Sequence, residues 1–90
     1  MPRYHLIFHR KAEKFLDGLD EKTKQGLLED VLCLADFTGL RSSLDIVKLK
    51  GQKGFYRLRT GKLRTVFTVD KASRTIIILK IERRERIYEK

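Results

Sequence analysis

The chain has 90 residues, which is enough for one small domain with a single hydrophobic core. Its formal net charge of +9 at pH 7 favours an anionic partner, and its one cysteine, Cys33, excludes an intramolecular disulfide. No apolar run is long enough to span a bilayer, and the first residues lack the apolar segment of a signal peptide. We therefore expect one cytoplasmic domain over residues 1–90, with no membrane partner.

The first predicted elements are a short strand and a helix. Residues 4–8 alternate in polarity, which places Tyr4, Leu6 and Phe8 on one face of a strand. From residue 9 the apolar spacing changes to i, i+3, i+4 and i+7, the pattern of a helix that packs one side against a core. The residues of this stripe are Ala12, Phe15, Leu16 and Leu19.

A second helix is predicted to begin after Asp20, whose carboxylate suits an N-cap, and to end near residues 37–39. Its apolar face is formed by Leu27, Leu28, Val31, Leu32, Leu34 and Ala35. We expect Cys33 to be buried on this side as a small apolar side chain. Two such helices joined by a short turn form a helical hairpin, which must pack on another layer.

The second half of the chain is predicted to supply that layer as a sheet. An extended piece at residues 46–49 leads into strands at 55–60, 63–69 and 74–81, with a hairpin turn at Gly61. The last strand is apolar on both faces at its middle, which is typical of a central strand. The expected fold is α+β in the order β-α-α-β-β-β, with the helical hairpin on one face of a small antiparallel sheet.

Positive charge is concentrated in this predicted sheet. Residues 1–40 carry six Lys and Arg against seven Asp and Glu, whereas residues 41–90 carry fifteen against five. Side chains alternate along a strand, so Arg57 and Arg59 should face away from the helices, together with Arg64 of the next strand. An arginine face suits a polyanion, because the planar guanidinium matches phosphate oxygens.

Further basic and aromatic residues flank this predicted face. The basic ones are Lys48, Lys50, Lys53, Arg83, Arg84 and Arg86. Tyr88 would stack on a nucleobase, as aromatic side chains do in proteins that bind single-stranded RNA. Phe55 is the other candidate for stacking, although a partly buried position at a sheet edge is the simpler expectation for it.

No other constellation in the sequence indicates catalysis. Cys33, His5 and His9 lack metal-ligand spacing, so neither a metal nor another cofactor is expected. The glycines at 51 and 54 lack the rest of a P-loop. If the protein is an enzyme, its cations and its phenol restrict the chemistry to neutralising a phosphate that the substrate's own 2′-hydroxyl attacks.

The ordered set of these features resembles the RelE/ParE toxin superfamily of prokaryotic toxin–antitoxin pairs. The resemblance covers nearly the whole chain and rests on the element order and on residues 47–51, 56–67 and 83–88. It implies a single RelE-like toxin domain: a metal-independent, ribosome-dependent endoribonuclease that cleaves mRNA in the A site and inhibits translation. It also implies a cognate RelB-like antitoxin.

The resemblance assigns roles to individual residues. Arg64 and Arg84 would hold the scissile phosphate, and Tyr88 would stack on or orient the nucleotide. Arg57 or Arg59 would lie near the attacking 2′-hydroxyl. Some bacterial members have lysine at these last two positions, and lysine can be tuned into a general base far more easily than arginine. The identity of the base is therefore open.

Two other functions fit the same sequence. The ParE branch of the superfamily poisons DNA gyrase, so expression of such a toxin would stop supercoiling before translation. A non-catalytic basic module would bind RNA or DNA in a salt-sensitive manner and cut neither.

Overall fold

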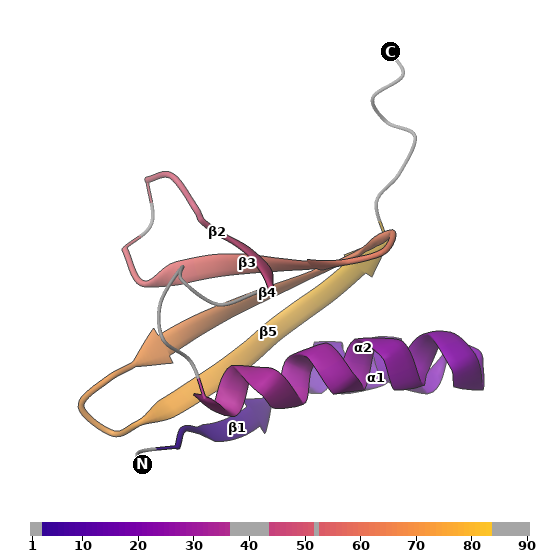
Figure 1. The fold of residues 1–90 in the computed structure, drawn as a ribbon, viewed down its shortest axis with the longest axis horizontal. Coiled ribbons are helices and arrows are strands. Elements are labelled where there is room, and N and C mark those ends of the chain that lie inside the picture. Colours follow the sequence, from indigo (N-terminus) through magenta and orange to yellow (C-terminus); the bar gives the residue numbers. More distant parts are fainter. Residues whose placement is uncertain (1–2, 37–43, 52, 84–90) are drawn as a thin grey trace.

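The computed structural model of the chain describes residues 3–36, 44–51 and 53–83. Helices and strands follow one another as shown in Figure 1. The elements are β1 His5–Phe8, α1 Arg10–Asp17, α2 Glu21–Cys33, the 3-10 helix η1 Leu34–Asp36, β2 Asp45–Lys48, β3 Phe55–Thr60, β4 Leu63–Asp70 and β5 Thr75–Arg83. The predicted α+β class is confirmed.

The five strands form one sheet in the order β1-β5-β4-β3-β2. Neighbours from β2 to β5 pair antiparallel, whereas β1 pairs with β5 in parallel. The structure thus adds two details to the expected order. The extended piece before β3 is a strand of its own, β2. The sheet is also mixed, because the helices and the other strands form a connection long enough to bring β5 beside β1 in parallel.

Both helices begin at residues whose side chains cap them. Nδ1 of His9 accepts a hydrogen bond from the backbone N–H of Lys11 at 3.1 Å, at the start of α1. Oδ2 of Asp20 accepts one from the backbone N–H of Thr23 at 3.1 Å, at the start of α2. Hydrogen bonding by Thr23 lowers the pKa of the exposed Asp20 carboxyl. No helix in the described ranges has the length and apolar content needed to cross a membrane.

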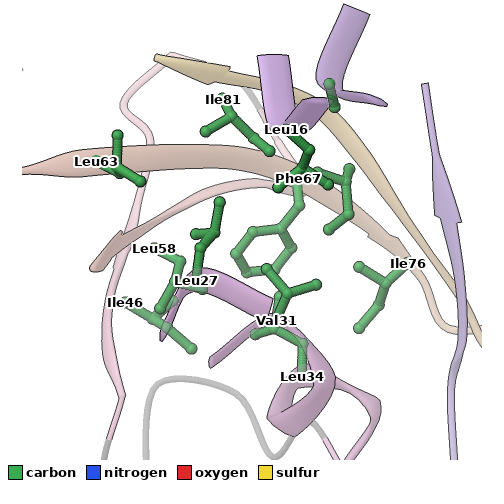
Figure 2. Packing of buried hydrophobic residues seen from close by; sticks show 12 residues of the cluster. Leu16, Leu27, Val31, Leu34, Ile46, Leu58, Leu63, Phe67, Ile76 and Ile81 are labelled. Carbon is green, nitrogen blue, oxygen red and sulfur yellow. The ribbon is translucent and has the colours of Figure 1, made fainter. Parts of the chain in front are cut away.

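One hydrophobic core lies between the helices and the sheet (Figure 2). Phe67 of β4 and Leu58 of β3 are fully buried in it, together with Leu27 and Val31 of α2. The ring of Tyr56 stacks on Phe67, with ring centroids 5.5 Å apart. Full burial of a side chain of this size contributes about 1.5–3 kcal/mol, so this layer of contacts holds the helices on the sheet.

The apolar face of α2 is narrower than predicted. Leu27 and Val31 are buried, but the side chain of Leu32 is 61% exposed and Cys33 is exposed as well. The expectation of a buried Cys33 is therefore wrong. At about 100° per residue, positions 32 and 33 turn away from the side of the helix that carries Leu27 and Val31.

A β-bulge interrupts the pairing of β4 with β5. Val66 pairs with Lys80 and its neighbour Phe67 pairs with Ile78, so Leu79 is an extra residue in β5. In such a bulge, two residues of one strand oppose a single residue of the other. Leu79 and Lys80 therefore both lie opposite Val66.

The burial pattern of β5 follows from this bulge. Ile76 and Ile78 are buried at a spacing of two residues, whereas the next buried residue is Ile81, at a spacing of three. Strict alternation from Ile78 would turn Lys80 and Glu82 into the core. The bulge instead places both charged residues on the face away from the helices, where water can solvate them.

Candidate nucleic-acid interface

The strand register brings three arginines to the side of the sheet opposite the helices, which we call the open face. Arg59 of β3 is the Cα partner of Arg64 of β4, and Arg57 is the partner of Val66. Leu58, between Arg57 and Arg59, is fully buried on the helix side. The alternation along β3 therefore turns both arginines outward, and the predicted common face of the three arginines is confirmed.

Arg59 and Arg64 occupy the middle of a row of four charged residues across the sheet, the charged row. Asp45 of β2 is the partner of Arg59, and Glu82 of β5 is the partner of Arg64. Like charges that face each other directly destabilise an antiparallel pair, and the two acids at the ends of the row offset this repulsion. Sheet stability alone gives no reason for the central Arg–Arg pair, whereas an anionic ligand would.

Arg59 is engaged within the charged row. Its Nε and Nη2 lie 2.9 Å and 2.8 Å from the same atom, Oδ2 of Asp45. Both side chains are about half exposed, so solvent screens the pair and limits its contribution to about 0.2–1 kcal/mol. Sequence reasoning missed Asp45, because its contact with Arg59 depends on the register between β2 and β3.

Arg57 and Arg64 differ from Arg59 in their hydrogen bonding. The Nε atoms of both are buried and have no hydrogen-bond partner within the described part of the chain. A buried donor without an acceptor costs about 1–3 kcal/mol. The two residues are diagonal neighbours, a relation in which Cα atoms lie about 7–8 Å apart, so one phosphate group is within reach of both long side chains.

The structure does not bring every predicted residue to the open face. Lys48 is the partner of Tyr56 and Arg83 is the partner of the buried Leu63, so both lie on the helix side of the sheet. Arg83 lines a groove there of about 340 Å³, between α2 and the hairpin of β3 and β4, together with Lys22 and Lys62.

The remaining predicted residues divide into two groups. Lys50 and Lys53 are exposed between β2 and β3. Arg84, Arg86 and Tyr88 lie outside the described residues, so their roles stay predictions.

A second groove, the bulge groove, lies on the open face and has a volume of about 350 Å³. It is lined by His9, Lys11, Phe55, Val66, Leu79 and Lys80. Val66 is the partner of Arg57, and Phe55 precedes Arg57 by two residues on the same face, so the groove adjoins the arginines. Sequence reasoning considered Phe55 but missed the other lining residues. Their convergence depends on the bulge and on the parallel pairing of β1 with β5.

Comparison with known proteins places this geometry in a family. Residues 6–88 match the family described as the ParE toxin of the type II toxin–antitoxin system parDE. The chain belongs to the RelE/ParE superfamily of toxins. Over 87 residues it is also 32% identical to RelE1 of Methanocaldococcus jannaschii, with 97% of each chain covered.

Solved structures of the RelE branch of this superfamily share the fold. The RelE–RelB complex of Pyrococcus horikoshii matches with a TM-score of 0.80 and 30% identity, over 96% of this chain and 99% of that chain. The RelB–RelE complex of Methanococcus jannaschii matches with a TM-score of 0.73 and 25% identity, over 92% and 95%. The isolated E. coli RelE toxin, at 21% identity and a TM-score of 0.77 over 92% and 86%, shows the common fold. The RelE-like expectation is confirmed.

Proposed function

We propose that this toxin stops translation in the cytoplasm by cleaving mRNA in the ribosomal A site, as a metal-independent endoribonuclease. The observation that carries the proposal is the pair Arg57 and Arg64, whose buried Nε donors have no partner among the residues that the structure describes. Membership of the superfamily supports the toxin role. The proposed substrate is the phosphodiester backbone of RNA, which would supply the missing acceptors.

The two arginines would act by electrostatic stabilisation. A phosphate between their side chains gains negative charge on its oxygens as the 2′-oxygen attacks, and donors held in place beforehand stabilise that charge without reorganising. Partial burial strengthens the interaction relative to water. Arg84 and Tyr88 are proposed to complete the site, from residues outside those described.

The proposed reaction breaks one bond and forms one bond at phosphorus. The 2′-oxygen of a nucleotide bonds to its own 3′ phosphorus, and the bond from phosphorus to the 5′-oxygen of the next nucleotide breaks. The products are a 2′,3′-cyclic phosphate and a 5′-hydroxyl. One proton leaves the 2′-hydroxyl, and one reaches the departing 5′-oxygen. Arginine stays protonated in proteins, so Arg57 and Arg59 are assigned to charge stabilisation and not to proton removal.

Glu82 is the carboxylate we propose as acceptor of the 2′-hydroxyl proton. It is the cross-strand partner of Arg64, and its Oε1 lies 3.7 Å from Nζ of Lys80. Asp45, the other acid of the charged row, is engaged by Arg59. The substitution Glu82→Gln keeps the size of the side chain and removes the proposed base, so we expect cleavage to slow by about 10²- to 10⁴-fold.

A RelB-like antitoxin is the proposed protein partner. The RelE chains of Pyrococcus horikoshii and Methanococcus jannaschii were solved in complex with RelB. A basic surface is commonly neutralised by an acidic segment that folds as it binds, and the open face offers such a surface.

The decisive experiment measures mRNA cleavage on programmed ribosomes for the wild type, Arg57→Ala, Arg64→Ala and Arg64→Lys. We expect Arg64→Ala to reduce the rate by about 10²- to 10³-fold, as the loss of one donor to a developing oxyanion does. Lysine should restore part of the rate, because it keeps the charge and loses the planar fork. Undiminished cutting by both alanine variants would remove the site assignment.

Gyrase inhibition is the second candidate, because the matching family is described by its ParE toxins. Pulse labelling of protein and DNA synthesis after induction separates the two. A block in supercoiling that precedes any loss of translation would indicate that the protein inhibits gyrase. Binding of RNA without cleavage would indicate a non-catalytic module.

A further inference from the structure

We propose that the bulge groove binds the nucleobase adjacent to the phosphate held by Arg57 and Arg64. The inference rests on the proposed function for its ligand, a single strand of RNA, and it adds a base-binding site next to the phosphate site. The site is built by the bulge in β5, which turns an additional side chain to the open face.

The lining of the groove matches the chemistry of a base. Its lining combines the apolar side chains of Phe55, Val66 and Leu79 with the cations of Lys11 and Lys80. A nucleobase has apolar faces that stack on aromatic rings, and it is joined to an anionic backbone that the two lysines would attract. The volume, about 350 Å³, lies within the range of about 300–1,000 Å³ found for small-ligand sites.

The groove also has the right position relative to the arginines. Phe55 and Arg57 are two residues apart on the same face of β3, which corresponds to about 7 Å along a strand. One RNA strand can therefore place a phosphate on the arginines and the neighbouring base over Phe55. Val66, which lines the groove, is the cross-strand partner of both Arg57 and Lys80, so the groove directly borders the arginines.

His9, another lining residue of the groove, supplies a hydrogen-bond donor. Its Nδ1 accepts the hydrogen bond that caps α1, so in the neutral ring the proton is on Nε2. No described residue accepts a hydrogen bond from this Nε2–H, so it can donate to an acceptor on the edge of a base, such as N7 of a purine. The N-cap bond thus orients the imidazole and favours the tautomer with its proton on Nε2.

The test uses RNA that carries 2-aminopurine at one position at a time and a 2′-O-methyl group at the attacking sugar. Binding of the full chain is measured with the RNA free and as the A-site codon of programmed ribosomes. We expect quenching of 2-aminopurine fluorescence that depends on the toxin and is confined to one position. Phe55→Leu should abolish this quenching and weaken binding by about 5- to 150-fold, the range that corresponds to one base–aromatic stack. Phe55→Trp should retain both the quenching and the binding affinity of the wild type.

Two protein variants and one modified RNA separate this site from a general effect on folding. Ile7→Ala removes an exposed apolar side chain of β1 outside the groove, and it should change neither quenching nor affinity. His9→Asn keeps a side chain that caps helices well, so it should preserve thermal stability and weaken binding several-fold. With an abasic nucleotide at the quenched position, wild type and Phe55→Leu should bind equally.

The outcomes distinguish this inference from the proposed function. Cleavage of mRNA without quenching at any position, free or on the ribosome, would remove the base site and leave the nuclease. Localised quenching that Phe55→Leu abolishes, without cleavage of an unmodified RNA, would keep the base site and remove the nuclease. Equal quenching in wild type and Phe55→Leu would also overturn the inference.

Discussion

The helix side and the open side of the sheet are made by the same strands, yet they meet opposite physical demands. Leu58 of β3 and Phe67 of β4 are fully buried on the helix side. Arg57 and Arg64, on the same two strands, are only half-buried on the open face. The buried side stabilises the fold through apolar contacts. In the described ranges, the open face holds an Arg–Arg pair and two buried Nε donors without partners, which cost stability. We therefore expect substitutions on the two faces to separate stability from the proposed ligand binding.

The largest expected effect on stability is at the centre of the buried side. Phe67→Ala should reduce the free energy of unfolding by about 3–5 kcal/mol, because it leaves a cavity among fully buried side chains. Urea denaturation measures this loss. Val66→Ala, at the next position on the open face, is the matched control and should cost less. Equal losses at the two positions would contradict the division between the faces.

Removing the two buried arginine donors should weaken RNA binding without lowering the stability of the fold. Arg57→Met and Arg64→Met should each weaken RNA binding and reduce the slope of log affinity against log salt by about 1, because each removes one phosphate contact. The melting temperature should stay the same or rise, since a buried donor without a partner disappears. Unfolding of either variant would mean that the arginine is a structural residue.

Deleting Leu79 should remove the bulge without removing the fold. The deletion restores strict alternation between Ile78 and Ile81, so both stay in the core and Lys80 still pairs with Val66. We expect a smaller loss in urea denaturation than for Phe67→Ala, together with loss of the base quenching described above. A chain that no longer folds would show that the bulge is needed for pairing rather than for binding.

Breaking the ion pair of the charged row should release Arg59. Asp45→Asn keeps the size of the side chain and removes the charge that holds both guanidinium nitrogens. We expect RNA affinity to rise a few-fold and stability to fall by less than about 1 kcal/mol, because the pair is half exposed. Lower affinity would indicate that Asp45 orients Arg59 for binding.

The smallest effect concerns the cap of α2. The pKa of Asp20 is lowered by its hydrogen bonds to Thr23, so the ionised carboxylate stabilises the folded state at neutral pH. That contribution is lost as the pH falls below the ordinary value of 3.8, when the carboxyl gains a proton. In thermal melts, Asp20→Asn should therefore flatten the fall in melting temperature between neutral and acid pH. An unchanged slope would assign the acid sensitivity to other carboxyls.

Local periodicity predicted much of this molecule correctly. The helical spacing of Ala12 and Leu16 and the alternation of Arg57, Leu58 and Arg59 depend only on backbone geometry, which is the same wherever a helix or strand forms. Gly61, with φ of 59°, occupies the hairpin turn that its missing Cβ permits. For these reasons the sequence alone predicts that the arginines share one face of the sheet.

The tertiary structure alone decided which further groups join that face. Alternation along β5 would have buried Glu82, and only the bulge, an irregularity in the pairing of two strands, turns it outward. The contact between Asp45 and Arg59 depends on the register of β2, and the place of His9 beside the open face depends on the parallel pairing of β1. Periodicity is a property of neighbouring residues, whereas register and bulges are set by hydrogen bonds and packing between segments far apart in the chain.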